Sequence, residues 1–182
     1  RLAEKMSWLS IDPASVRHIL ITHQDTDHVG AVEADSPGLF RDAKLYIGEV
    51  ENRYLTGEVR RKVIYRLYKL PQVTIHNEKV LLHDGEVFDI GGIKIECFLV
   101  PGHTWGHMVY FIDDKYLFTG DTLFRGSIGT TMFGGSDREM HDTLEALYRY
   151  PGDYGIYPGH GESTSLSDEK RDNPFFGPFR SN

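Results

Sequence analysis

The chain has 182 residues and a mass of 20.8 kDa, with 40% hydrophobic and 26% charged residues. This ordinary composition predicts a single globular domain over residues 1–182 with a substantial core. No apolar stretch approaches the roughly 20 residues of a membrane-spanning helix, so we expect no membrane partner. The net charge of −7 disfavours non-specific nucleic-acid binding. We therefore expect a cytoplasmic protein that acts on a small molecule.

The hydrophobic pattern predicts strands alternating with short helices. In the first half we expect a helix, a helical turn, two strands and then a helical region, with the first four at residues 1–9, 12–13, 16–22 and 44–47. Successive strands joined by Asp-Gly, Gly-Gly and Asp-Asp turns are expected next, at residues 86–90, 93–100, 107–112 and 116–119. This succession indicates an antiparallel meander.

The last part of the chain predicts a helix followed by a strand. Met140, Leu144 and Leu147 recur at helical spacing within residues 137–150, and residues 155–157 form an apolar strand. The single cysteine, Cys97, excludes an intramolecular disulfide, and its apolar strand context predicts a buried thiol.

Potential metal ligands follow the predicted strands. The segment from His23 to His28 reads His-Gln-Asp-Thr-Asp-His directly after an apolar strand, and three later strands each end in a further donor: His103, Asp121 and His160. Loops at strand ends allow a rigid sheet to hold donors from distant positions at one point. The pattern therefore predicts a site for two metal ions.

The spacing of the first segment has a structural interpretation. If the chain remains extended, His23, Asp25 and Asp27 project to one side by the period of two, and a turn then brings His28 round. Divalent metals of borderline softness accept imidazole and carboxylate, and a bound water can become a hydroxide nucleophile at neutral pH. Asp121 is the expected bridge between the ions.

Of the remaining histidines, we expect packing or surface roles for His18, His76, His83 and His141. His107 has two interpretations because it follows His103 by four residues, a spacing that suits joint ligation on a helix. Gly106 and the following apolar strand argue against a helix. We therefore favour a role at the start of the strand, or in support of the ligands.

Four ordered motifs are similar to those of the metallo-β-lactamase superfamily, with the glyoxalase II-like hydrolases as the nearest likeness. The motifs are His23-x-Asp25-x-Asp27-His28, Pro101-Gly102-His103-Thr104-x-Gly106-His107, Thr119-Gly120-Asp121 and Tyr157-Pro158-Gly159-His160-Gly161. The likeness covers residues 16–176, and the closing run through Glu169 and Asn173-Pro174-Phe175 resembles the small bacterial members.

The resemblance implies a fold and a ligand set. The fold is α+β, a four-layer αββα sandwich whose opening strands we expect to be missing from this chain. It places His23, Asp25 and His103 at one metal ion, and Asp27, His28 and His160 at the other. Asp121 lies between the ions, and we expect Asp27 to be catalytic by orienting the nucleophile.

Two departures from the family pattern bear on the site. Asp25 stands where the superfamily usually has histidine, and Thr130 stands where glyoxalase II-like sequences usually have arginine. We expect two divalent ions, zinc by default, while the harder carboxylate of Asp25 also favours iron or manganese.

A basic segment interrupts this acidic chain. Arginines and lysines cluster between Arg53 and Lys69, with tyrosines among them. Its apolar stripe indicates an ordinary helix with a solvated basic face. The alternative is a cap over the site, hinged at Gly57, that attracts an anionic acyl substrate.

Together these features predict a hydrolase that cleaves an ester, thioester or lactone through a metal-activated hydroxide. One alternative is a persulfide dioxygenase-like enzyme with one iron ion. The other is a non-catalytic ligand-binding or regulatory protein with the same fold.

Overall fold

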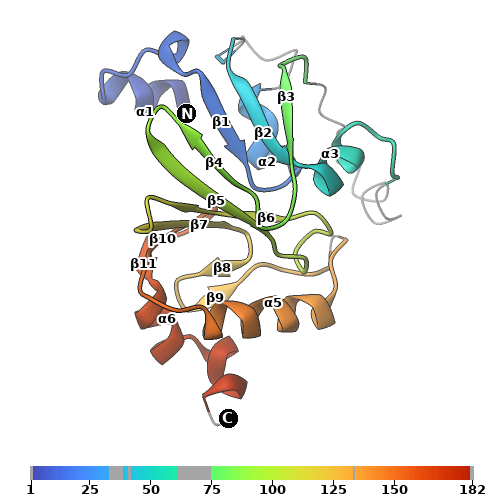
Figure 1. The fold of residues 1–182 in the computed structure, drawn as a ribbon, viewed down its shortest axis with the longest axis vertical. Helices are drawn as coiled ribbons and strands as arrows, with labels where there is room; N and C mark the ends of the chain where they lie inside the picture. Colours follow the sequence, from blue (N-terminus) through green and yellow to red (C-terminus); the bar gives the residue numbers. More distant parts are fainter. Residues whose placement is uncertain (1, 33–38, 41, 61–74, 133, 181–182) are drawn as a thin grey trace. The chain divides into compact units, whose positions relative to one another are not determined.

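The computed structural model describes residues 2–32, 39–40, 42–60, 75–132 and 134–180 (Figure 1). The chain divides into two compact units, Arg1–Leu82 and His83–Asn182. The prediction of one domain over residues 1–182 stays a prediction. Among the described residues, every helix is too short or too polar to span a bilayer.

The first unit contains a parallel sheet with the strand order β1-β2-β3. Its strands are β1 (His18–Ile21), β2 (Lys44–Gly48) and β3 (Lys79–Leu82). Its helices are α1 (Leu2–Trp8), α2 (Thr26–Val29) and α3 (Glu49–Leu55), with 3-10 helices at Pro13–Ser15 and Gly30–Val32. Because β1 and β2 run parallel, with Ile21 opposite Ile47, the segments that follow them start at the same edge of the sheet.

The core of this unit lies between the sheet and its helices. Met6 of α1, Leu45 of β2 and Leu55 of α3 are buried in one apolar cluster. The expected helix over residues 1–9 and the two expected strands are confirmed. The strand β3 was not predicted from the sequence. In it, Leu82 is buried and Leu81 is exposed.

The second unit contains a six-stranded sheet in the order β11-β10-β7-β6-β5-β4. Its strands are β4 (Val87–Ile90), β5 (Ile93–Leu99), β6 (Met108–Ile112), β7 (Tyr116–Gly120), β10 (Gly155–Pro158) and β11 (Thr164–Ser165). The antiparallel pairing of β4 to β7 confirms the expected meander. The strand β10 pairs parallel to β7, so Asp121 and His160 both follow carboxyl ends at one edge of the sheet.

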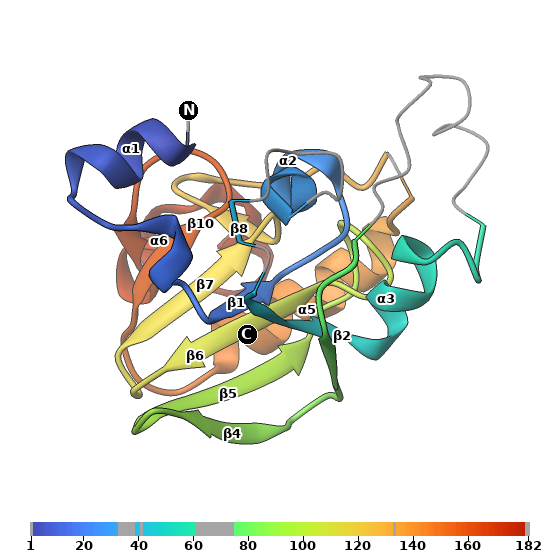
Figure 2. The same cartoon turned by 90° about the horizontal axis from the view of Figure 1, so that it is seen from above.

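One face of this sheet is covered by α5 (Asp137–Arg149), which lies behind the strands in Figure 2. Ser136 caps the helix by accepting a hydrogen bond from the Glu139 amide. Met140, Leu144 and Leu147 are buried against the sheet, which confirms the predicted helix. The unit also holds β8 (Leu123–Phe124), β9 (Ser127–Ile128), α6 (Leu166–Asp172) and a 3-10 helix at Pro174–Phe179.

One expectation about the first ligand segment is wrong, and another falls largely outside the described residues. The prediction that the chain stays extended through Asp27 is wrong, because α2 begins at Thr26. His28 is instead positioned by this short helix. The sequence had indicated a turn of the chain after an extended segment. The proposed basic cap falls largely on residues 61–74, including Arg61 and Lys62, which lie outside the described residues.

Candidate metal centre

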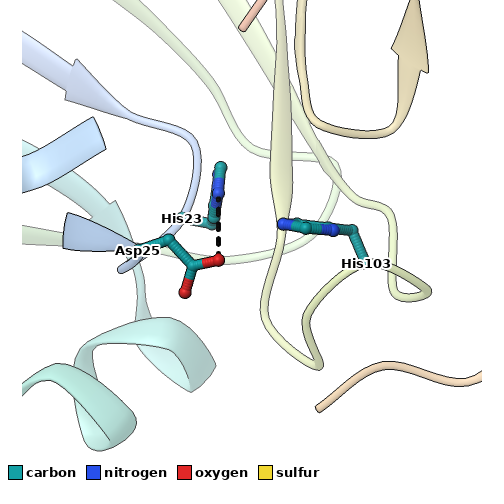
Figure 3. A group of neighbouring side chains, drawn as sticks. All are labelled: His23, Asp25 and His103. Atoms are coloured by element: carbon teal, nitrogen blue, oxygen red, sulfur yellow. Dashed lines mark ion pairs between the residues drawn. The ribbon is translucent and has the colours of Figure 1, made fainter. Parts of the chain in front are cut away.

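The first unit presents a buried imidazole beside a carboxylate at the end of β1. His23 is fully buried, and its Nε2 lies 3.8 Å from Oδ2 of Asp25 (Figure 3). The other ring nitrogen, Nδ1, lies 3.1 Å from the Thr22 hydroxyl oxygen. This contact orients the ring so that Nε2 faces the carboxylate.

Asp27 and His28 follow on α2. The Nε2 atom of His28 lies 3.7 Å from Oδ2 of Asp27, and the rings of His23 and His28 have centroids 4.0 Å apart. Asp25 is the N-cap residue of α2 and keeps an extended backbone, so the helix starts between the two aspartates. The first unit thus brings together all four ligands that the sequence predicted for it.

The second unit gathers its three predicted ligands around one carboxylate oxygen. Oδ2 of Asp121 lies 3.7 Å from Nε2 of His103 and 3.5 Å from Nε2 of His160. The amide of Gly159 donates to the carbonyl of Gly120, which holds the ends of β7 and β10 together. One carboxylate oxygen therefore faces two imidazoles.

The tautomer of His103 follows from its contacts. Its Nδ1 lies 2.6 Å from the carbonyl oxygen of Thr130, which can only accept, so Nδ1 carries the proton. The lone pair of Nε2 then points towards Asp121, which is the arrangement expected of a metal ligand held by a neighbouring carbonyl. The contact uses the main chain of Thr130, one of the two positions where the sequence departs from the expected family pattern.

His107 supports Asp121 through the main chain. It is fully buried, and its Nε2 accepts a hydrogen bond of 3.0 Å from the Asp121 amide. Its Nδ1 therefore carries the proton and donates to the Thr122 hydroxyl, 3.3 Å away. The strand β6 begins at the next residue, so the predicted place of His107 at the start of a strand is confirmed.

Glycines allow close backbone approach around these ligands. A Cβ at Gly129 would lie 1.8 Å from the carbonyl oxygen of Asp121, and a Cβ at Gly135 would lie 1.8 Å from that of Gly102. Gly102 itself has φ +149° and packs against the backbone of Met140 in α5. Gly102, Gly129 and Gly135 thus form a tightly packed wall close to Asp121 and His103.

Glu169, which belongs to the closing run of the resemblance, has a structural role. Its buried carboxylate accepts hydrogen bonds from the Gly126 amide, the Thr164 hydroxyl and the Asn173 side-chain amide. These bonds tie the C-terminal segment to the β8–β9 hairpin, which directly follows Asp121.

The distances within each unit fit the demands of a metal ion. Two ligand atoms that are each about 2.1 Å from a tetrahedral zinc ion lie about 3.4 Å from each other. The four His–Asp separations range from 3.5 to 3.8 Å. That is longer than a direct hydrogen bond and close to the spacing of atoms that share an ion.

Known proteins match this chain over most of its length. The model of the metallo-beta-lactamase superfamily matches residues 1–160. The chain belongs to the metallo-beta-lactamase superfamily. The predicted resemblance to this family is confirmed, as is the fold that it implies.

Three similar proteins illustrate the range of the family. A probable metallo-hydrolase of Streptococcus pyogenes is 31% identical, over 87% of this chain and 69% of that protein. The hydroxyacylglutathione hydrolase GloC of Haemophilus influenzae is 28% identical, over 96% of this chain and 81% of that enzyme. The crystal structure of TTHA1623 in a di-iron-bound form is 28% identical, with a TM-score of 0.72 over 96% of this chain and 83% of that one. Homologues thus include named hydrolases. A structural neighbour has been solved in a di-iron-bound form.

Proposed function

We propose that this protein is a metal-dependent hydrolase of esters, thioesters or lactones that uses two divalent ions. His23, Asp25 and His103 would hold one ion, Asp27, His28 and His160 would hold the other, and Asp121 would be a ligand to both.

The observation that carries the proposal is the arrangement around Asp121. Its Oδ2 faces His103 and His160 at 3.7 and 3.5 Å, and the tautomer of His103 leaves the facing nitrogen able to coordinate. The donor set in both units combines imidazole and carboxylate, which suits zinc, iron or manganese.

Bound ions of this kind supply a water nucleophile at neutral pH and polarise a carbonyl oxygen. The residues of the chain hold and orient the reactants. Asp27 lies on α2 with its carboxylate more than half exposed, so it is placed to accept a hydrogen bond from the attacking water and direct its lone pair. The packed glycine wall and the buried ring of His107 keep Asp121 in position during turnover.

Thioesters of a small hydroxy acid are the first substrates to test, because a homologous enzyme of similar length is a hydroxyacylglutathione hydrolase. The described part of the basic segment includes Arg53 and the exposed Arg60. Positive charge there favours an anionic acyl group. We propose a small-molecule substrate and zinc as the ion, with iron as the alternative, in a cytoplasmic setting.

The test combines elemental analysis with a substrate panel. The purified protein should contain about two zinc, iron or manganese ions per chain and hydrolyse at least one of a set of p-nitrophenyl esters, lactones and glutathione thioesters. Removal of the ions by a chelator should abolish turnover, and their return should restore it. One iron ion together with oxygen consumption on a persulfide would replace the hydrolase with a dioxygenase. Two bound ions without any turnover across the panel would favour a binding or regulatory protein.

A further inference from the structure

A buried carboxylate outside the ligand set lies beneath the first ligand segment. Glu51 belongs to the first turn of α3, and its side chain is fully buried within the described part of the chain. Its Oε1 accepts a hydrogen bond of 2.9 Å from the main-chain amide of Gln24. Gln24 is the residue between His23 and Asp25.

The fold explains how two distant segments meet here. The strands β1 and β2 are parallel neighbours, so the loop after β1 and the helix after β2 begin at the same sheet edge (Figure 1). The loop contains the ligands, and α3 provides the carboxylate. Sequence analysis could not distinguish Glu51 from Glu49, because both are acidic residues in the first turn of a helix.

The free-energy cost of burying the Glu51 carboxylate must be offset by favourable interactions. An ionised carboxylate removed from water costs several kcal/mol unless charges or hydrogen bonds offset the loss. The N-terminus of α3 and the Gln24 amide supply part of that compensation. The neighbouring Glu49 occupies the same helix turn while exposed to water, so the helix alone does not require a buried acid.

We propose that Glu51 is a positioning residue that fixes the main chain between His23 and Asp25, and thereby sets the metal affinity of the first ligand segment. This role rests on the proposed metal centre. The hydrogen bond to the Gln24 amide fixes the peptide plane that joins His23 to Gln24, and it thereby restrains the backbone that leads on to Asp25. Release of that amide lets both ligands rotate away from a shared ion.

Three variants separate positioning from general stability. Glu51→Gln retains an oxygen acceptor of the same length, Glu51→Asp retains the charge but withdraws the oxygen by one methylene, and Glu51→Leu removes both. The matched control is Leu55→Ala, which lies one turn later on α3 and is buried in the core of the same unit. It destabilises the unit through a cavity and leaves the Gln24 contact intact.

The measurement is isothermal titration of Zn²⁺ alone into chelator-stripped full-length protein, with thermal unfolding of each variant in parallel. Loss of a supporting hydrogen bond around a metal ligand typically weakens metal binding by about 10–100-fold. We expect that loss in Glu51→Asp and Glu51→Leu, and a change of less than about threefold in Glu51→Gln and Leu55→Ala. Because Glu51→Asp keeps the buried charge, it keeps the test valid if Glu51→Leu does not fold.

Two outcomes would overturn the positioning role. One is wild-type zinc affinity in Glu51→Asp, and the other is equal weakening in Leu55→Ala at a matched loss of unfolding temperature. Weakening of Glu51→Gln to the level of Glu51→Asp would also overturn it, since the acceptor would then be irrelevant. The titration needs no substrate, so a protein that binds zinc but hydrolyses nothing refutes only the proposed reaction. A wild-type chain that binds no zinc refutes both proposals.

Discussion

Substitution of Gly129 by alanine tests whether the packed glycine wall holds the metal centre. The new Cβ would lie 1.8 Å from the carbonyl oxygen of Asp121 and 3.2 Å from Nδ1 of His103. Real Cβ contacts do not fall below 3.0 Å, so the backbone on one side must move by at least about 1.2 Å. Preorganised sites tolerate displacements of only about 0.5 Å, and a misplacement near 1 Å can cost about 100-fold in rate.

We therefore expect Gly129→Ala to lower kcat/KM about 100-fold and to weaken binding of at least one metal ion. The assays are steady-state kinetics on the best ester or thioester and titration of zinc into the stripped protein. The matched control is Gly177→Ala in the same unit, where a Cβ meets nothing within 4 Å, and its kinetics should equal those of the wild type. Retention of wild-type kcat/KM and zinc affinity in Gly129→Ala would refute the reasoning from this close approach.

Other perturbations address individual ligands and the buried thiol. His28→Ala and His160→Ala should each reduce bound metal towards one ion per chain and abolish most hydrolysis, and two tightly bound ions in either variant would contradict the assignment. Asp121→Ala should lose affinity for both ions, as measured by elemental analysis, since its Oδ2 faces two imidazoles. Asp25→His should tighten zinc at the weaker of two unequal sites, and an unchanged titration would exclude Asp25 as a ligand. Burial, together with the nearby Glu86 carboxylate, raises the pKa of the Cys97 thiol from 9.0 to about 11. The unfolded chain therefore loses this proton first, so the stability contributed by the neutral thiol is complete below pH 9 and declines as the pH rises towards 11. Chemical denaturation of wild type and Cys97→Ala at pH 8 and 10.5 should show a larger loss for the wild type, and equal losses would argue against the raised pKa.

Much of the fold could be predicted because its signals are local. The meander from β4 to β7 has recognisable turn sequences between apolar runs, and α5 has apolar residues at amphipathic helical spacing. The placement of the candidate ligands after strands was likewise predictable, because each follows an apolar run. The start of α2 at Thr26 was not, because a four-residue helix has too few residues for a periodic signal.

The hydrogen bonds that position the candidate ligands could not be predicted from the sequence, for a different reason. The carbonyl of Thr130 and the amides of Asp121 and Gln24 are main-chain groups, and a main-chain group is the same for almost every residue type. Gly129 is equally hard to recognise, since in a glycine-rich run the sequence does not tell a glycine that must approach another backbone from one that forms a turn.

The bond from His103 to the carbonyl of Thr130 has a consequence for divergence within the family. Because the acceptor is a main-chain oxygen, the side chain at position 130 can be exchanged without changing the tautomer or orientation of His103. A position beside the candidate metal centre is thereby open to mutation towards new substrates while His103 keeps its geometry. Selection on specificity and selection on metal binding can then act on different atoms of one residue.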